Sequence, residues 1–234
     1  MLKYTLLSGG TGVDIVDFKQ QYLQGRRDFR DIELAGVNLN WTNLIGIDLS
    51  GANLQNAKFS AATLRQAELV RANLQGANLR AADLRNANLT GANLTGANLG
   101  RADLIDIILE EADLTYANLT ETISKQANLR NANLCQANLG GLDLSHADLA
   151  GADLRGANLI AVNFTEANLQ GANLSHQDLT GASLRGTNLQ GANLSDTRLN
   201  QAELYGADLS NANLTNACLE QAKLAGARLP VCLL

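Results

Sequence analysis

Residues 72–99 read ANLQGANLRAADLRNANLTGANLTGANL, and this stretch decides the fold because a leucine returns every five residues from Leu74 onward. The same spacing continues in both directions without a slip, from Phe29 to Leu229, which gives 41 consecutive centres. Ala stands two residues before the centre in 29 of the 41 repeats, and Asn or Asp stands directly before it in 29 of 41. The repeat unit is therefore Ala-(Asn/Asp)-Leu-x-x. The centres that are not leucine are Phe29, Phe59, Phe164 and Ser124.

A period of five fits neither ordinary secondary structure. On an α-helix each leucine would sit about 140° from the last, so the apolar stripe would circle the axis. On a flat strand a step of five reverses the face each time. The pattern predicts a chain that turns a corner once per repeat, with the centre and the Ala two residues before it pointing inward. Asn, Asp, Gly, Ser and Thr at the remaining positions suit bends, because their side chains bond nearby backbone and tolerate unusual dihedrals.

With these motifs, the chain resembles the pentapeptide-repeat proteins over residues 27–234. The resemblance implies an all-β fold, a right-handed quadrilateral β-helix (a solenoid) with four repeats per coil, so that equivalent residues stack every 20 positions. Forty-one repeats make about ten coils, and at a strand spacing of about 4.8 Å the rod is near 50 Å long. Stability is expected to come from the stacking of each coil on its neighbours.

The two ends of such a rod need covers. Residues 1–26 are interpreted as an N-terminal tail and a capping helix, and residues 27–234 as the repeat β-helix. The helix is expected between Asp14 and Gly25, with Ile15, Phe18, Tyr22 and Leu23 on the face that covers the first coil. The apolar tail after Pro230 either folds over the last coil or forms a homodimer through it.

Composition excludes several classes of function. The net charge of −5 excludes a strongly basic nucleic-acid binder. Three irregularly spaced cysteines give no disulfide framework or zinc signature. His146 and His176 fall on opposite faces, more than a coil apart, so no metal site or catalytic constellation is expected, and the chain is interpreted as a non-enzyme without cofactors. The apolar run at the start is too short for a signal peptide and no long apolar stretch exists, which favours a cytoplasmic protein without a membrane partner.

The repeat breaks its own rules between residues 104 and 127. Isoleucines stand at outward positions, and Ile107 replaces the inward Ala. Between positions 102 and 123 there are six carboxylates and no basic residue. This segment is the candidate partner-binding site, and the alternative is neutral drift. The candidate residues are Ile105, Ile108, Glu110, Glu111, Tyr116 and Ile123. Polar replacement of the three isoleucines is expected to abolish partner binding while the fold survives.

Three further groups have two interpretations each. At Ser124 either Leu142, one coil later, fills the space that the small centre leaves, or the chain kinks so that Ile123 turns inward. The inward Gln177 is expected to bond Thr197, which stacks above it, or the backbone. A basic group is either a solvated face or a site for an anionic partner. Its members are Lys58, Arg65, Arg71, Arg80, Arg85 and Arg101.

The resemblance implies two functions. The first is a rigid protein-interaction scaffold or regulator, since the family is abundant in cyanobacteria and a few members regulate cell differentiation; the long, uniform consensus here looks like those members. The second is a DNA mimic that binds a type II topoisomerase. A 50 Å stretch of duplex carries on the order of thirty negative charges, whereas residues 31–234 carry 20 acidic and 13 basic residues, a balance of −7. We therefore expect an unidentified protein partner rather than a topoisomerase.

Overall fold

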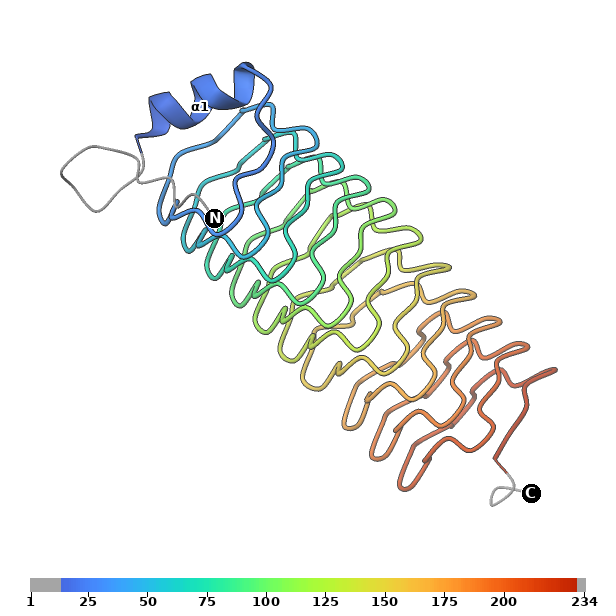
Figure 1. The fold of residues 1–234 in the computed structure, drawn as a ribbon. Helices are drawn as coiled ribbons and strands as arrows, with labels where there is room; N and C mark the ends of the chain where they lie inside the picture. The colour runs from blue at the N-terminus through green and yellow to red at the C-terminus, as the bar shows by residue number, and fades with distance from the viewer. Residues whose placement is uncertain (1–13, 231–234) are drawn as a thin grey trace.

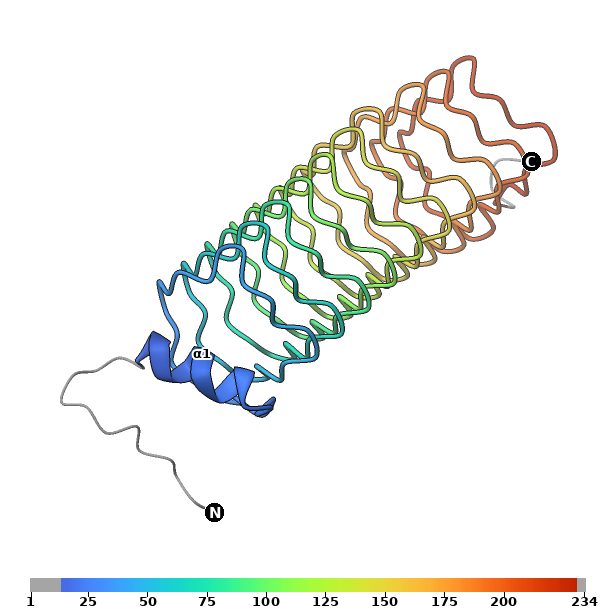
Figure 2. The same ribbon diagram turned by 90° about the horizontal axis from the view of Figure 1, so that it is seen from above.

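The computed structural model describes residues 14–230 and shows one continuous rod of stacked coils (Figure 1). Parallel β-bridges join the residue before each centre to the residue 20 positions later, from Asp28–Asp48 to Asp208–Arg228. Each coil therefore holds four repeats, one on each side, and the predicted right-handed quadrilateral β-helix is confirmed. Figure 2, turned by 90°, shows the same coils in one straight stack.

Each repeat bonds to the next coil through the backbone. In the repeat centred on Leu34, the N–H of Leu34 donates to the carbonyl of Asn53 at 2.8 Å, and the N–H of Gly36 donates to that of Gln55 at 2.7 Å. The N–H of Asn53 returns a bond to the carbonyl of Ile32 at 2.9 Å. Because these bonds run along the rod axis, the coils stack on one another as parallel strands do in a sheet.

The corner of every repeat lies at the second residue after the centre. All of these residues from Asp31 to Gly226 have a positive φ, and the N–H that follows donates back to the centre carbonyl, as Val37 does to Leu34 at 3.2 Å. This is the arrangement of a β-turn whose third residue is left-handed, which favours glycine. Fifteen of the 21 glycines occupy this position, so the corner requirement explains the glycine content.

The core is a column of leucine and alanine along the axis. Centre leucines such as Leu74 and Leu94, and inward alanines such as Ala72, are fully buried. Outward Asn side chains bond the backbone of their own turn, as Asn93 does when it accepts from the N–H of Thr95 at 3.0 Å. They also bond between coils, as Asn93 does when its side-chain amide donates to Asn73 at 3.4 Å. The sequence pattern predicted both the inward pair and the side-chain bonds to the backbone.

Helix α1, Ile15–Leu23, lies across the N-terminal end of the rod (Figure 1). The carboxylate of Asp14 caps its start by accepting from the N–H of Val16 at 2.8 Å. Phe18 is 1% exposed, and its ring centroid lies 4.7 Å from that of Phe29 in the first coil. The hydroxyl of Tyr22 donates to the carbonyl of Ile45 at 3.0 Å. The predicted capping helix is confirmed.

Leu23 corrects one part of that prediction. It was placed on the covering face, but it is 81% exposed. Leu23 is the last residue of α1, and Gly25 turns the chain away with a φ of +99°. The helix therefore covers the first coil with Phe18 and Tyr22, helped by the half-buried Ile15.

Within residues 14–230, the core is less enclosed at the C-terminal end. The last coil holds Leu214, Leu219, Leu224 and Leu229, which are only partly buried, whereas the centres before them are fully enclosed. The apolar tail that follows Pro230, for which the sequence predicted a second cover or a dimer contact, lies outside the described residues.

Candidate functional site

In the irregular repeats between residues 104 and 127, the centre residue stays in the core. Ser124 is 2% exposed and Ile123 is 51% exposed, so the predicted kink that turns Ile123 inward is wrong. Leu142, one coil later, is 1% exposed and lies above the buried Thr122, as the compensation hypothesis requires. The hydroxyl of Ser124 donates to the carbonyl of Asp143 at 3.2 Å and so remains satisfied in the core.

Backbone pairing is weakened at this step. In nearly all other steps the N–H of the centre donates to the next coil, as Leu104 does to Ile123 at 2.7 Å. Within the described residues, the N–H groups of Glu121, Ser124 and Gln126 make no such bond to the coil above, although the bridge between Ile123 and Asp143 persists. The bulk of Leu142 next to Thr122, at positions usually filled by Ala, gives a physical reason for the missing backbone bonds.

Two of the six candidate residues come together on one face. Ile105 and Ile123 belong to the face formed by the repeats centred on Leu104 and Ser124 and by their equivalents every 20 residues, here called the Ile105 face. Their spacing of 18 residues is the one that brings Thr95 to Asp113 at 3.2 Å and Arg185 to Glu203 at 2.8 Å. The two isoleucines are therefore diagonal neighbours on adjacent coils.

The other candidates lie elsewhere. Ile108, 37% exposed, and Glu110 belong to the adjacent face, and Glu111 stands at its far corner. Tyr116, 65% exposed, stands at the corner diagonally opposite the one between Ile105 and Ile108. The six residues therefore do not form one patch, and a flat partner reaches only Ile105 and Ile123 together.

Three of the six carboxylates near these isoleucines are paired with arginines. Glu121 accepts from Arg101 at 2.7 Å, and Glu110 lies 4.0 Å from Arg130. On the Ile105 face itself Arg85 lies 3.3 Å from Asp103. Among the described residues Asp106, Glu111 and Asp113 make no ion pair, so counter-charges from neighbouring coils neutralise only part of the predicted acidic segment.

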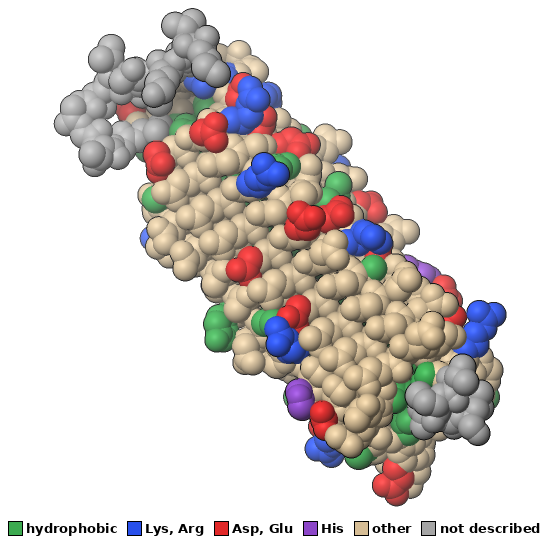
Figure 3. All heavy atoms as spheres, turned by 60° about the horizontal axis from the view of Figure 1, so that its bottom comes forward, with side chains coloured by type: hydrophobic (Ala, Val, Ile, Leu, Met, Phe, Trp, Pro, Cys, Tyr) green, Lys and Arg blue, Asp and Glu red, His purple; other side chains and the backbone are tan. Residues whose placement is uncertain are grey.

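Three of the six members of the basic group, Arg65, Arg85 and Arg101, are paired with carboxylates in the same way. Arg85 bonds the carboxylate of Asp83 at 2.5 Å and thereby lowers the pKa of Asp83, while Arg65 approaches the same carboxylate at 4.0 Å. Further along this face, hydrogen bonds from Lys223 and Arg185 lower the pKa of Glu203 to about 2. Figure 3 shows acidic and basic side chains side by side on a surface that is mostly uncharged. This interspersion favours the solvated-face interpretation over an anionic partner.

Gln177 bonds the backbone rather than Thr197, the second of the two interpretations given above. The amide of Gln177 donates to the carbonyl of Leu154 at 2.8 Å, and the hydroxyl of Thr197 donates to that of Leu174 at 3.1 Å. Both side chains therefore bond the backbone of the preceding coil rather than each other.

The histidines stand at opposite corners. Each faces a carboxylate one coil later, His146 with Glu166 at 3.3 Å and His176 with Asp196 at 3.8 Å. Among residues 14–230, no three His, Cys, Asp or Glu side chains lie close enough to hold a metal ion. The one helix in that range is too short and too polar to cross a membrane.

Comparisons with known sequences and structures both identify pentapeptide repeats in this chain. A sequence profile for pentapeptide repeats matches residues 32–69, 67–104, 92–123, 127–165, 157–196 and 192–229. No curated protein sequence matches the chain. Among solved structures the chain is similar to HetL, a pentapeptide repeat protein involved in heterocyst differentiation regulation from the cyanobacterium Nostoc sp. strain PCC 7120. The two are 36% identical with a TM-score of 0.90, over 94% of this chain and 98% of HetL.

Two other solved structures share less with the chain. A second Nostoc pentapeptide repeat protein, alr5209, is 39% identical over 44% of this chain and 79% of its own length, with a TM-score of 0.28. QnrB1, a plasmid-mediated fluoroquinolone resistance protein, is 18% identical over 86% of this chain and 92% of its own, with a TM-score of 0.40.

Proposed function

This chain belongs to the pentapeptide-repeat family, and from that premise we propose that it is a non-catalytic regulator that docks a protein partner along the Ile105 face. The observation that carries the proposal is the pair formed by the half-buried Ile105 and the 51% exposed Ile123, on a face whose equivalent positions one coil away hold Arg85, Asp103 and Lys125. Apolar side chains at the centre of a polar surface are typical of contact sites, because their burial by a partner is favourable and the charged surroundings orient it.

Similarity to HetL supports the regulatory part of the proposal. The similarity extends over nearly the full length of both chains, and HetL is described as involved in the regulation of heterocyst differentiation. A uniform rod without inserted loops offers long flat faces, so binding rather than catalysis is the activity that this architecture favours.

The charge pattern disfavours the DNA-mimic alternative. Duplex DNA presents an unbroken series of negative charges. On the Ile105 face Asp83, Asp103 and Glu203 are each paired with Arg or Lys, so the face presents dipolar pairs rather than a negative stripe.

We expect the double substitution Ile105→Thr and Ile123→Asp to weaken partner binding by roughly thirtyfold or more, the effect of losing one hot spot of about 2 kcal/mol. Asp is the residue at both equivalents of Ile123, and Thr stands at the same repeat position elsewhere, so the fold is retained. The measurement is affinity capture from the native cell with the purified wild-type and variant chains.

Tyr116→Asn is the matched control. Tyr116 is 65% exposed at a corner away from the Ile105 face, and Asn stands at the same repeat position at Asn86 and Asn131, so its replacement removes a large exposed side chain without touching that face. Equal capture by the wild-type chain and the double variant would refute the proposed docking face.

A further inference from the structure

One step of the β-ladder is open between residues 156–163 and 175–183. In the series from Asp28–Asp48 to Asp208–Arg228 every bridge is present except the one that would pair Asn158 with Asp178. Among the described residues, the N–H groups of Leu159 and Ala161 lack the bonds to the coil above that their equivalents make, and Asp178 lacks the bond to the coil below. Both flanking steps are closed, since Leu139 donates to Asn158 at 3.0 Å and Leu179 to Arg198 at 2.8 Å.

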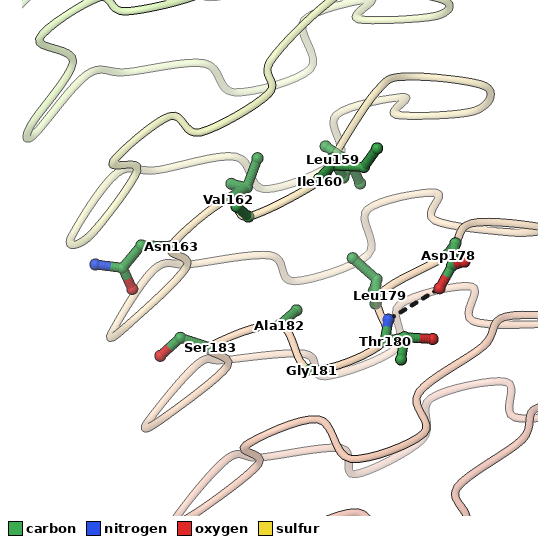
Figure 4. Close-up of a pocket in the computed structure, with 11 residues that line it drawn as sticks. Leu159, Ile160, Val162, Asn163, Asp178, Leu179, Thr180, Gly181, Ala182 and Ser183 are labelled. Atoms are coloured by element: carbon green, nitrogen blue, oxygen red, sulfur yellow. Dashed lines mark hydrogen bonds between the residues drawn. The ribbon is translucent and has the colours of Figure 1, made fainter.

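The opening contains a cavity of about 320 Å³, lined by residues 159–163 of one coil and 178–183 of the next (Figure 4). This volume is at the lower end of ligand pockets. Leu159, Val162 and Leu179 lie behind the opening and are nearly fully buried, while Ile160 stands exposed at the rim. In Figure 4, Leu179 points from its coil toward the coil of Leu159 and Ile160.

Gln177 accounts for the opening. It occupies an inward position that Ala usually fills, lies above Ala157, and reaches across the step to the carbonyl of Leu154. Thr187 is an inward polar residue that makes the same kind of bond, to Phe164 at 2.8 Å, yet the ladder around it stays closed because its side chain is shorter. Gln177 is therefore a wedge that holds the two coils apart.

Backbone groups on both walls of the opening need partners. The N–H groups of Leu159 and Ala161 face the carbonyls of Asp178 and Thr180, and none of these bonds is made. Unpaired backbone groups bind water or another chain. An extended peptide carries N–H and C=O groups in alternation at strand spacing, so it satisfies donors and acceptors together.

We propose that this opening, named the Gln177 slot, binds a short extended segment of a protein partner, with a small apolar side chain against the exposed Ile160 at the rim. A polyanion is a poor occupant, because the rim carries the carboxylate of Asp178, whose counter-charge Arg198 already lies 3.4 Å away.

The slot lies next to the proposed docking face. Ile123, Asp143, Asn163 and Ser183 form one column of bridges, and the last two line the slot. One partner can therefore contact Ile123 and insert an extended segment two coils further along. The inference rests on the proposed function, since it supplies the second contact of the same partner.

The test uses amide NMR of the full chain with the capped tetrapeptide acetyl-Thr-Val-Thr-Val-amide as the probe. Peptide titration is expected to shift the amides of Leu159, Ala161 and Asp178 and to leave those of the closed steps unchanged. In Gln177→Ala the slot closes, so the peptide shifts disappear and these amides exchange with solvent roughly tenfold or more slowly than in the wild type.

Thr187→Ala is the control, because it removes an inward polar side chain from a closed step and should retain the peptide shifts. Absence of shifts in the wild type, which means a slot filled by water only, would overturn the proposal, as would shifts that persist in Gln177→Ala. In partner capture, wild-type affinity of Gln177→Ala together with loss in the Ile105/Ile123 variant would refute the slot and leave the docking face standing.

Discussion

Phe18→Ala is expected to lower the free energy of unfolding by about 3–5 kcal/mol, the usual cost of removing a buried aromatic ring. The ring is 1% exposed and packs on Phe29, so its loss leaves a cavity between α1 and the first coil. The urea midpoint of the full chain measures the effect. Leu23→Ala, on the same helix but at an 81% exposed position, should change the midpoint little.

Removal of residues 1–26 is expected to promote association between chains. Without α1 the first coil exposes Phe29 and the unpaired backbone of its edge, and such edges promote association between chains. Light scattering should therefore rise for the truncated chain. A truncated protein that remains monodisperse and equally heat-resistant would show that α1 is not the cap.

The second large effect is expected in the middle of the rod. Leu74→Asp buries a carboxylate in the axial core, where Leu74 is fully buried and only apolar side chains surround it. The cost is expected to exceed about 4 kcal/mol, because a buried charge without a partner belongs to the most destabilising class of substitutions. Thermal unfolding followed by circular dichroism measures the loss.

Gln75→Asp is the matched control for that substitution. It introduces the same carboxylate one residue later, at an exposed outward position that loses only the 2.9 Å bond between Gln55 and Gln75. Its melting temperature should remain close to that of the wild type. Equal destabilisation by the two variants would mean that the centre does not point inward.

Most of the fold was predictable because the repeat imposes one geometry on every quintet. The spacing of five, with Leu at the centre and Ala two residues before it, determined which side chains enter the core and which turn outward. The capping helix was also predictable from the sequence, since Asp14 is a good N-cap and Phe18 and Tyr22 lie one turn apart. Leu23 was misplaced because sequence spacing does not show that the helix ends there and that the chain turns away at Gly25.

The candidate site was less predictable. Adjacency in sequence grouped Tyr116 and Glu111 with Ile105, but the corners of the coil place them apart. The ion pairs were missed for the same reason, since Arg101 and Arg130 reach Glu121 and Glu110 across a full coil. Both relations follow from the coil length, because an offset of 20 residues joins the ion pairs and an offset of 18 residues places Ile105 diagonally beside Ile123.

The open step at Gln177 could not be predicted from the pattern. The sequence marked Gln177 as an inward polar residue, and the bond to the backbone was anticipated. Whether a longer side chain repacks inside the core or pushes two coils apart depends on the space left by Ala157 and Val162, which no local motif encodes.

Site-specific photo-crosslinking tests the central claim, docking along the Ile105 face, most directly. A benzophenone amino acid placed at position 105 is compared in native cell extract with the same group at position 75, on the opposite face of the rod. The account predicts a discrete crosslinked protein from position 105 and little or none from position 75. Equal yields from both positions, or a product from position 75 alone, would contradict it.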